Sequence, residues 1–386
     1  MERPEGKIMT HRERVVSALL RKQPDKVPID LGSTINSSMV VEGYEKLRRH
    51  FGHEFDTRLC NRMMRAVVMD EPVLQAMDID TRGVFIGGPL KGGDQELGLD
   101  CYRDFWGIER RKPEGGYYYD LVKSPLAGEI SISDIMKYPW PDPDDPGFVQ
   151  NLKPRVRWLR ENTDAAIVLQ LPPAFIHPSQ FLRGFEDWYC DFAYHSKVME
   201  PLFDAVLEIT LQITKNALKE IGREVDVVCV AEDIGTQDRL MVSHDHYQRY
   251  IKPRHWKYFR QIRDLSSGKL LYHSCGCITS IMEDLIDIGV EALNPIQVTA
   301  RGMVPVELKK KYGRHLAFWG GIDVQYLLPK GTVQEVEQRV EELIEQMGGG
   351  GGYILSATHN IQPDIPLENV LAAFQHARAY SPSFGK

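Results

Sequence analysis

Apolar, β-branched segments alternate with helical stretches along the last two thirds of this chain, and this alternation constrains the fold most strongly. The segments are mostly apolar rather than alternating in polarity, which is typical of parallel strands buried on both faces. Strands are predicted at residues 165–170, 225–231, 269–273, 292–295, 316–319 and 352–356, and earlier at 27–31 and 84–86. Amphipathic helices, with apolar residues three and four positions apart, are predicted at residues 196–221, 246–265, 278–288 and 333–347.

About eight strands alternating with helices predict an α/β fold, a single (β/α)8 TIM barrel, with a doubly wound open sheet as the alternative. The open sheet of dinucleotide-binding proteins is disfavoured, because no Gly-x-Gly-x-x-Gly follows an early strand and no Gly-Lys-Ser/Thr phosphate loop occurs. All 386 residues are expected to form one domain. Residues 1–150 would be a helical and irregular N-terminal extension with the first strands, and residues 151–386 would form the main barrel.

Two features of the extension are specific enough to predict. Residues 10–20 have the pattern of an amphipathic helix. Residues 138–146 are nearly all proline or directly precede proline, so they are expected to form an ordered loop rather than a helix or a central strand.

Charge and hydropathy exclude several classes of partner. The chain has 47 Lys and Arg against 54 Asp and Glu, a formal net charge of −7, so the clustered positive charge of a nucleic-acid surface is not expected. No apolar run approaches the roughly 20 residues that span a bilayer, so no membrane association is expected. The first 14 residues lack the apolar core of a signal peptide, which predicts a cytoplasmic protein.

Polar residues follow several of the predicted strands, at the point where each strand ends. In a barrel, the carboxyl ends of all strands meet at one face, where active sites form. These residues are therefore expected to converge although they are far apart in the sequence. We predict that Asn294, Gln297 and Asp323 bind the substrate at this face.

His273 and Cys275 form the strongest local signal. Residues two apart on a strand point to the same face, and imidazole with thiolate suits zinc. A catalytic zinc needs about three protein ligands, and His359 is placed to supply the third from another strand end. Cys277 extends the pattern, but Gly276 is expected to break the strand and turn Cys277 away. The alternative is that His273 and Cys275 are buried side chains without a metal.

Glu232 and Asp233 follow the strand predicted at residues 225–231. A carboxylate pair there could act as general base, bind a substrate group or orient a metal-bound imidazole, so both are predicted catalytic residues. The alternative, that one of them caps the next helix, is about equally supported.

Several motifs together resemble the uroporphyrinogen decarboxylase superfamily. They are MTHRERVVSALLRKQPDKVPID, RGFEDWYCDF, HSCG, LNPIQVTARGMVPVELKKKYG and FWGGIDVQYLLP with GGYILSATHNIQPDIPLENV, and the resemblance extends from about residue 9 to 380. It implies a single (β/α)8 barrel of one of two branches: metal-free porphyrinogen decarboxylases, or zinc-dependent methyltransferases that act with corrinoids, such as methylcobamide:coenzyme M methyltransferases and O-demethylases.

The residues favour the methyltransferase branch. The decarboxylase motif has arginines for the substrate's propionates after the opening proline, whereas residues 27–33 contain none. The methyltransferase motif is His-x-Cys at one strand end, matched by His273 and Cys275, with a second Cys at a later one. His359 stands at that later position, so a zinc ion here would keep a charge of about +1 and be a stronger Lewis acid.

The resemblance thus implies a zinc methyltransferase that moves a methyl group between a small methylated ether, amine or thiol and a corrinoid (cobalamin) carrier. The chain has no Asp-x-His-x-x-Gly, the motif of corrinoid carriers, so the cobalamin is expected to arrive on a partner protein that docks over the barrel mouth, or free. Two alternatives stay open: a lyase or decarboxylase acting on another small acid, and a non-catalytic binding barrel.

Overall fold

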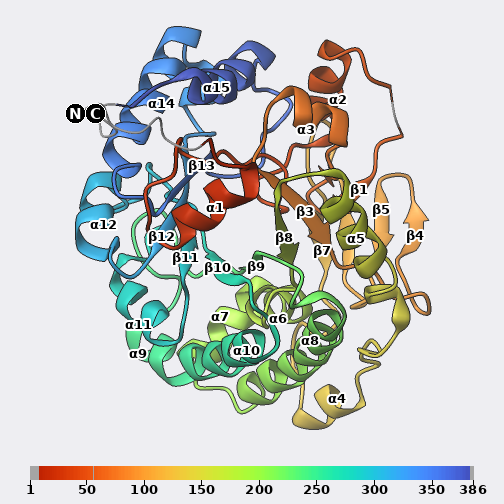
Figure 1. The fold of residues 1–386 in the computed structure, drawn as a ribbon. Helices are drawn as coiled ribbons and strands as arrows, with labels where there is room; N and C mark the ends of the chain where they lie inside the picture. Colours follow the sequence, from red (N-terminus) through yellow and green to blue (C-terminus); the bar gives the residue numbers. More distant parts are fainter. Residues whose placement is uncertain (1–7, 55, 383–386) are drawn as a thin grey trace.

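A parallel sheet of seven strands forms the centre of the computed structural model, which describes residues 8–54 and 56–382 (Figure 1). Its strands follow the order β13-β12-β11-β10-β9-β8-β3. Among these seven, each strand therefore lies beside the one that comes before or after it along the chain. The strands are β3 (Thr81–Phe85), β8 (Ala166–Gln170), β9 (Val227–Ala231), β10 (Lys269–His273), β11 (Ala292–Asn294), β12 (Ala317–Ile322) and β13 (Tyr353–Ala357).

The segment around Ile29 occupies the eighth position of the barrel. Ile29 forms a parallel bridge with Leu355 of β13, and on its other side its carbonyl accepts a hydrogen bond of 3.1 Å from the Asp80 N–H, just before β3. Pro28 has no N–H to donate, which keeps this pairing short. The predicted TIM-barrel fold is confirmed, and the eighth strand is reduced to a single bridge.

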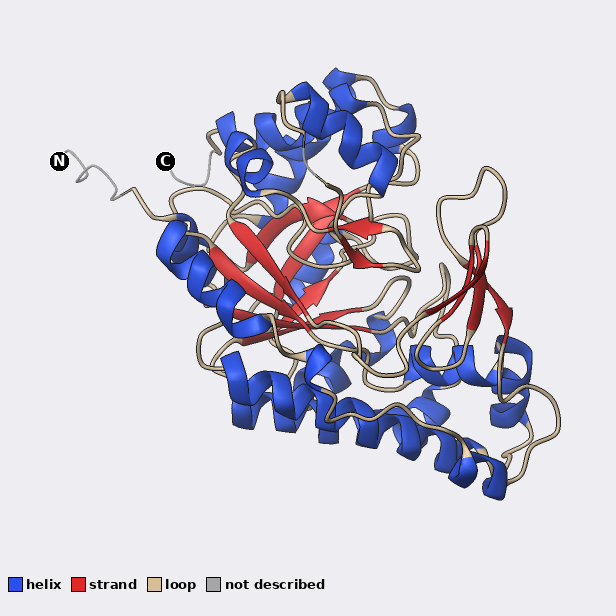
Figure 2. Cartoon of the chain, turned by 90° about the vertical axis from the view of Figure 1, so that its right-hand side faces the viewer, coloured by secondary structure: helices blue, strands red, loops and turns tan. Residues whose placement is uncertain are grey.

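Helices cover the outside of the sheet (Figures 1 and 2). The main ones are α5 (Leu152–Asn162), α6 (Ile176–Arg183), α7 (Phe185–Ala193), α8 (Met199–Ile221), α10 (Lys252–Leu265), α11 (Met282–Asp287), α12 (Pro305–Tyr312), α14 (Val333–Met347) and α15 (Leu367–Ala379). Shorter ones are α2 (Val41–His50), α3 (Glu71–Ala76), α4 (Ile132–Lys137), η1 (Pro146–Phe148), α9 (His244–His246), η3 (Thr279–Ile281) and α13 (Leu327–Lys330).

The helix predicted at residues 246–265 is divided in the structure. A π-helical segment, η2 (Tyr247–Ile251), separates α9 from α10, and Pro253 lies in the first turn of α10. Proline cannot donate a backbone hydrogen bond and its ring clashes with the preceding turn, which explains the break at this point. No helix in the described part of the chain is long and apolar enough to cross a membrane.

Helix α1 (His11–Leu19) closes the amino-terminal end of the barrel. Its residues Val15, Ala18 and Leu19 belong to the same buried cluster as strand residues that face the barrel interior, among them Val168 and Leu271. The opposite, carboxyl-terminal end of the barrel is where the candidate site lies.

A second sheet was not predicted from the sequence. Four short antiparallel strands stand to one side of the barrel (Figure 2): β4 (Gln95–Gly98), β5 (Cys101–Arg103), β6 (Glu109–Arg111) and β7 (Asp120–Lys123). A small hairpin, β1 (Leu59–Asn61) with β2 (Ala66–Val67), precedes them. The single-domain organisation predicted for residues 1–386 stays a prediction.

Candidate metal centre

Three potential ligands come together at the carboxyl end of the barrel. His273 is the last residue of β10, Cys275 follows two residues later, and His359 follows the end of β13. One ligand atom from each of the three lies within 4.8 Å of the others. Cys275 Sγ is 3.5 Å from His273 Nε2, which matches the ~3.5 Å expected between sulfur and nitrogen ligands of a tetrahedral zinc.

Two asparagines orient the His273 ring. Its Nδ1–H donates to Asn294 Oδ1, since an amide oxygen can only accept, and this leaves the Nε2 lone pair directed toward the cluster. This lone pair accepts a hydrogen bond of 2.9 Å from Asn36 Nδ2, which a bound metal would replace. A partner that fixes the tautomer of an imidazole is typical of metal-binding histidines.

The donor set fits a zinc ion chemically. Burial, aided by the nearby His273, lowers the pKa of His359 to about 4, so its imidazole is neutral and can bind a metal. Neither ring nitrogen of His359 has a hydrogen-bond partner among the described residues, which leaves a lone pair free beside His273 and Cys275. Burial raises the pKa of the Cys275 thiol well above its usual range, and a bound cation would reverse this by stabilising the thiolate.

Asp233 lies beside the cluster. Its Oδ1 accepts the Cys275 N–H at 2.7 Å and is 3.8 Å from His273 Nε2. Burial alone would raise the pKa of Asp233, but His177, His273 and the Cys275 N–H together lower it, so the carboxylate is ionised. Its own N–H donates to His177 Nε2 at 3.1 Å. Asp233 thus supplies negative charge and holds the Cys275 backbone.

Glu232 does not join the cluster. Its side chain is fully buried, with Oε1 accepting the Phe175 and Ile176 N–H groups at the start of α6 and Oε2 2.7 Å from His255 Nε2. Glu232 therefore caps α6, an earlier helix, and not the next helix that the alternative named. Its predicted catalytic role remains untested.

Asn294, the first of the three predicted substrate-binding residues, is buried against His273 and donates to the Trp319 carbonyl at 3.3 Å. Gln297 Oε1 accepts the Gly276 N–H at 2.7 Å. Asp323 accepts three backbone N–H groups around the start of α13. These contacts are with the protein itself, so the substrate-binding role of all three stays a prediction.

Cys277 is turned away from the cluster, as expected from Gly276. Its Sγ lies 3.8 Å from Thr279 Oγ1, and its N–H donates to the Thr236 carbonyl at 2.7 Å. Gly276 has φ +87° and packs against the backbone of Gly235, a conformation and closeness that only glycine tolerates.

A cavity of about 600 Å³ opens above the cluster, with Asp233, His273 and His359 in its wall. The antiparallel sheet and the adjoining loops cover it with aromatic rings, including Tyr102, Trp106 and Tyr119, and Phe181 of α6 adds another. The second sheet is therefore part of the site, although no pattern in the sequence indicates it.

Two further polar residues at the cavity were missed. Asn36 follows the first strand position, and His177 follows β8, so both lie beyond carboxyl strand ends. The predicted site residues all follow the late strands. Including the polar residues that follow the early strands would have found both.

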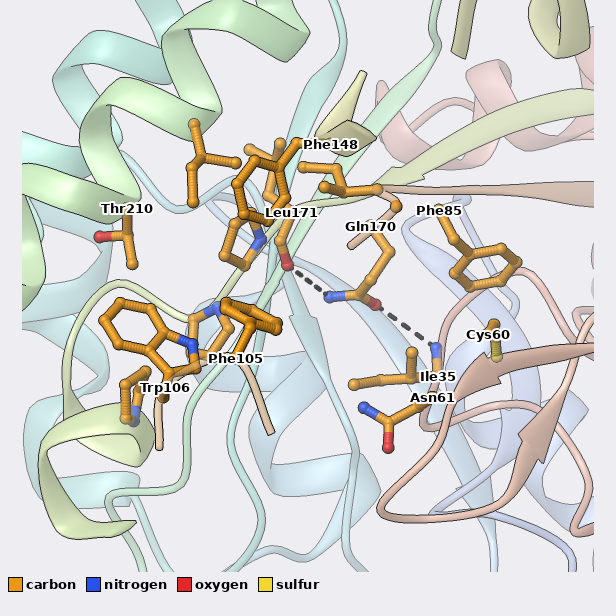
Figure 3. Close-up of a pocket in the computed structure, with 16 residues that line it drawn as sticks. Ile35, Cys60, Asn61, Phe85, Phe105, Trp106, Phe148, Gln170, Leu171 and Thr210 are labelled. Atoms are coloured by element: carbon orange, nitrogen blue, oxygen red, sulfur yellow. Dashed lines mark hydrogen bonds between the residues drawn. The ribbon is translucent and has the colours of Figure 1, made fainter. Parts of the chain in front are cut away.

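A smaller cavity of about 220 Å³ adjoins the first (Figure 3). Seven residues line both, namely Ile35, Asn61, Phe105, Trp106, Gln170, Pro173 and Pro178. Gln170 is held between them, with Nε2 donating to the Leu171 carbonyl at 3.1 Å and Oε1 accepting the Ile35 N–H at 3.4 Å (Figure 3).

Comparison with known families settles the ancestry. Residues 128–380, about two thirds of the chain, match the family described as uroporphyrinogen decarboxylase (URO-D). The chain belongs to the uroporphyrinogen decarboxylase family. The family expected from the sequence motifs is therefore confirmed, and the match includes every strand from β8 to β13 and all three candidate ligands.

Within this family, the chain is similar to two methylcobamide:CoM methyltransferases MtaA, one from Methanosarcina barkeri and one from its strain Fusaro. Each is 26% identical over 174 residues, which is 44% of this chain and 47% of the relative. The chain thus spans about half the length of the curated relatives it matches. These relatives agree with the methyltransferase branch that the motifs indicated.

A solved structure has the same fold as this family member. A methyltransferase from Methanosarcina mazei superposes with a TM-score of 0.66 at 17% identity, covering 96% of this chain and 99% of that one. At this identity the likeness supports the barrel fold alone, and it extends over the N-terminal third that the family match leaves out.

Proposed function

We propose that this chain is a zinc-dependent methyltransferase that moves a methyl group between a small methylated substrate and a corrinoid carrier protein. One observation carries the proposal: His273, Cys275 and His359 place their ligand atoms within 4.8 Å of one another at the wall of a cavity of substrate size. The similarity to methylcobamide:CoM methyltransferases supports the same reaction class.

A bound zinc ion would supply Lewis acidity toward the atom that carries the methyl group. With one thiolate and two imidazoles as ligands, its formal charge would be +1, which makes it a stronger Lewis acid toward an ether oxygen than a neutral zinc centre with two thiolates. The electron pair of Co(I) in the corrinoid would attack the methyl carbon. The C–O bond would break, and its electron pair would remain on oxygen. The oxygen would then take a proton from water.

The surrounding residues prepare the ligands for this role. Asn294 fixes the tautomer of His273, and Asp233 holds the Cys275 backbone and adds negative charge close to the cluster. The Asp233 N–H in turn donates to His177. We assign Asn294 and Asp233 as positioning residues.

The test combines metal analysis with methyl transfer, using Cys275→Ser and its matched control Cys277→Ser, whose side chain lies outside the cluster. We expect about one zinc per chain in the wild type and in Cys277→Ser, and loss of most of it in Cys275→Ser. Transfer from methoxylated aromatics, methylamines or methylthiols to a cognate corrinoid protein should fall with the zinc.

No transfer from any of these donors at full zinc occupancy would contradict the proposal. Absence of zinc from all three proteins would favour a lyase or a binding barrel instead.

A further inference from the structure

The charges around the larger cavity are already paired. The described residues that line it include two arginines: Arg62 lies 2.7 Å from Glu96 and stacks over Tyr102, while Arg110 lies 3.2 Å from Asp104 and stacks over Phe181. A carboxylate or sulfonate that lies away from the candidate metal site would lose its hydration here without gaining a free side-chain cation. The cavity therefore disfavours anionic ligands.

A cationic ligand gains little either. Of the four carboxylates in the wall, Asp94 and Asp104 face these arginines, Asp233 accepts the Cys275 N–H, and Asp120 is exposed to solvent and so keeps its hydration. What the cavity does offer is aromatic surface. Flat rings pack well against aromatic walls, so the lining selects an uncharged arene.

The polar side chains deep in the described wall of the smaller cavity are already paired, and Asn61 Nδ2, at the boundary shared with the larger cavity, has no partner among the described residues. Thr210 Oγ1 donates to the Ala174 carbonyl at 2.5 Å, and the Gln170 amide is held on both sides. The remaining lining is mainly apolar, including Phe85, Phe148 and Ile213 (Figure 3). Apolar cavities of roughly 150 Å³ bind groups the size of benzene, so about 220 Å³ accommodates a short alkyl chain.

The two cavities meet close to the ligand cluster. Ile35 lines both, and the next residue, Asn36, donates to His273 Nε2. Phe105 and Trp106 also line both cavities, so a ring that packs against them can direct one substituent toward the cluster and another into the side cavity.

We infer that the methyl donor is an uncharged methoxyarene whose apolar substituent occupies the cavity between Phe148, Gln170 and Ile213. This inference rests on the proposed function and names its substrate class. It predicts discrimination against anionic donors and a gain in affinity with each carbon of the substituent.

Calorimetric binding to the zinc-loaded protein tests this with 2-methoxyphenol, its 4-propyl derivative and its 4-carboxylate. Each buried methylene contributes about fourfold, so we expect the 4-propyl compound to bind about fifty-fold tighter than the parent and the carboxylate to bind more weakly. Equal binding of the parent and the propyl compound, or tighter binding of the carboxylate, would overturn the inference.

Variants assign the gain to the side cavity. Ile213→Phe fills it and should reduce the propyl advantage to less than about fivefold, whereas Ile213→Val, which leaves the cavity open, should retain it. If Ile213→Phe fails to fold, Ile86→Phe, just after β3, fills the same cavity. A propyl advantage that survives filling overturns the assignment.

Methyl transfer from the same compounds separates the inference from the proposed function. Transfer without any substituent effect would leave the methyltransferase intact and overturn the inference. Selective binding without transfer from any compound would overturn the assignment of the cavity to a methyl donor.

Discussion

Cys275 and His359 differ in how they respond to a metal. Burial raises the pKa of the Cys275 thiol, which is therefore protonated near neutral pH in the metal-free chain. Burial lowers the pKa of His359 to about 4, so its imidazole is neutral at pH 6, and burial also lowers the pKa of His273. His273 Nε2 accepts the Asn36 N–H, which only a neutral imidazole can do. Only the thiol has a proton to lose when zinc binds.

We therefore expect zinc binding near pH 6 to release about one proton, with the affinity rising about tenfold per pH unit. Calorimetry in two buffers of different ionisation enthalpy measures the number of protons released per zinc ion. A zinc-bound water has a pKa of about 7, so at pH 6 it contributes little to this number. In Cys275→Ser the release should fall to near zero. Release of two or more protons would mean that an imidazole is charged before binding.

Asn294 orients the ring of the candidate ligand His273 without being a ligand itself. It accepts the Nδ1–H of His273 from the neighbouring strand β11. Asn294→Ala should lower zinc affinity by about 10- to 100-fold while leaving all three ligands in place. Competition with a fluorescent zinc chelator measures this change. Gln297→Ala, which alters a residue outside the cluster, serves as the control, and an equal loss in both variants would contradict the positioning role.

Adjacent residues at the end of β9 serve different parts of the structure, because successive side chains on a strand point to opposite sides. Asp233 faces the cavity and Glu232 faces helices α6 and α10. The sequence presents the two as an equivalent pair. Their division follows only once Ala231, which lines the cavity, is known to point inward.

Glu232→Leu should therefore destabilise the fold without altering the metal centre. It removes the partner of two N–H groups and of buried His255, a loss of about 3–5 kcal/mol in the free energy of unfolding. Urea unfolding measures it, with Asp233→Asn as the control that should change stability by much less. Unchanged stability with lost transfer would instead support the catalytic role predicted for Glu232.

The elements that could be predicted are those whose sequence pattern is set by burial. Strand β10 was predicted to the residue, since Lys269–His273 is a short apolar run ended by glycine. Strands β4–β7 were missed because they have three or four residues each and β4 is exposed throughout, which leaves no periodic pattern.

The residues of the candidate site likewise divide into those that the sequence predicts and those that it does not. His273 and Cys275 could be predicted because a two-residue spacing at a strand end fixes their common direction, and His359 because it follows another predicted strand, at the position where the family motif has a second cysteine. The aromatic rings that cover the cavity could not, because Tyr102 and Trp106 reach it through an antiparallel sheet that the sequence does not reveal.

At the scale of the whole molecule, each part of the chain has a separate task. The ends of β10 and β13 supply the candidate ligands, α1 closes the far end of the barrel, and the second sheet covers the cavity. The covered cavity and the candidate ligands therefore lie at the same end of the barrel.

X-ray absorption spectroscopy of the purified protein at the zinc edge tests the central claim most directly. The account predicts about one zinc per chain, with one sulfur ligand at about 2.3 Å and two imidazole nitrogens at about 2.0 Å. In Cys275→Ser the sulfur signal should vanish, and in Cys277→Ser it should remain. A zinc shell without sulfur, or no zinc at all, would contradict it.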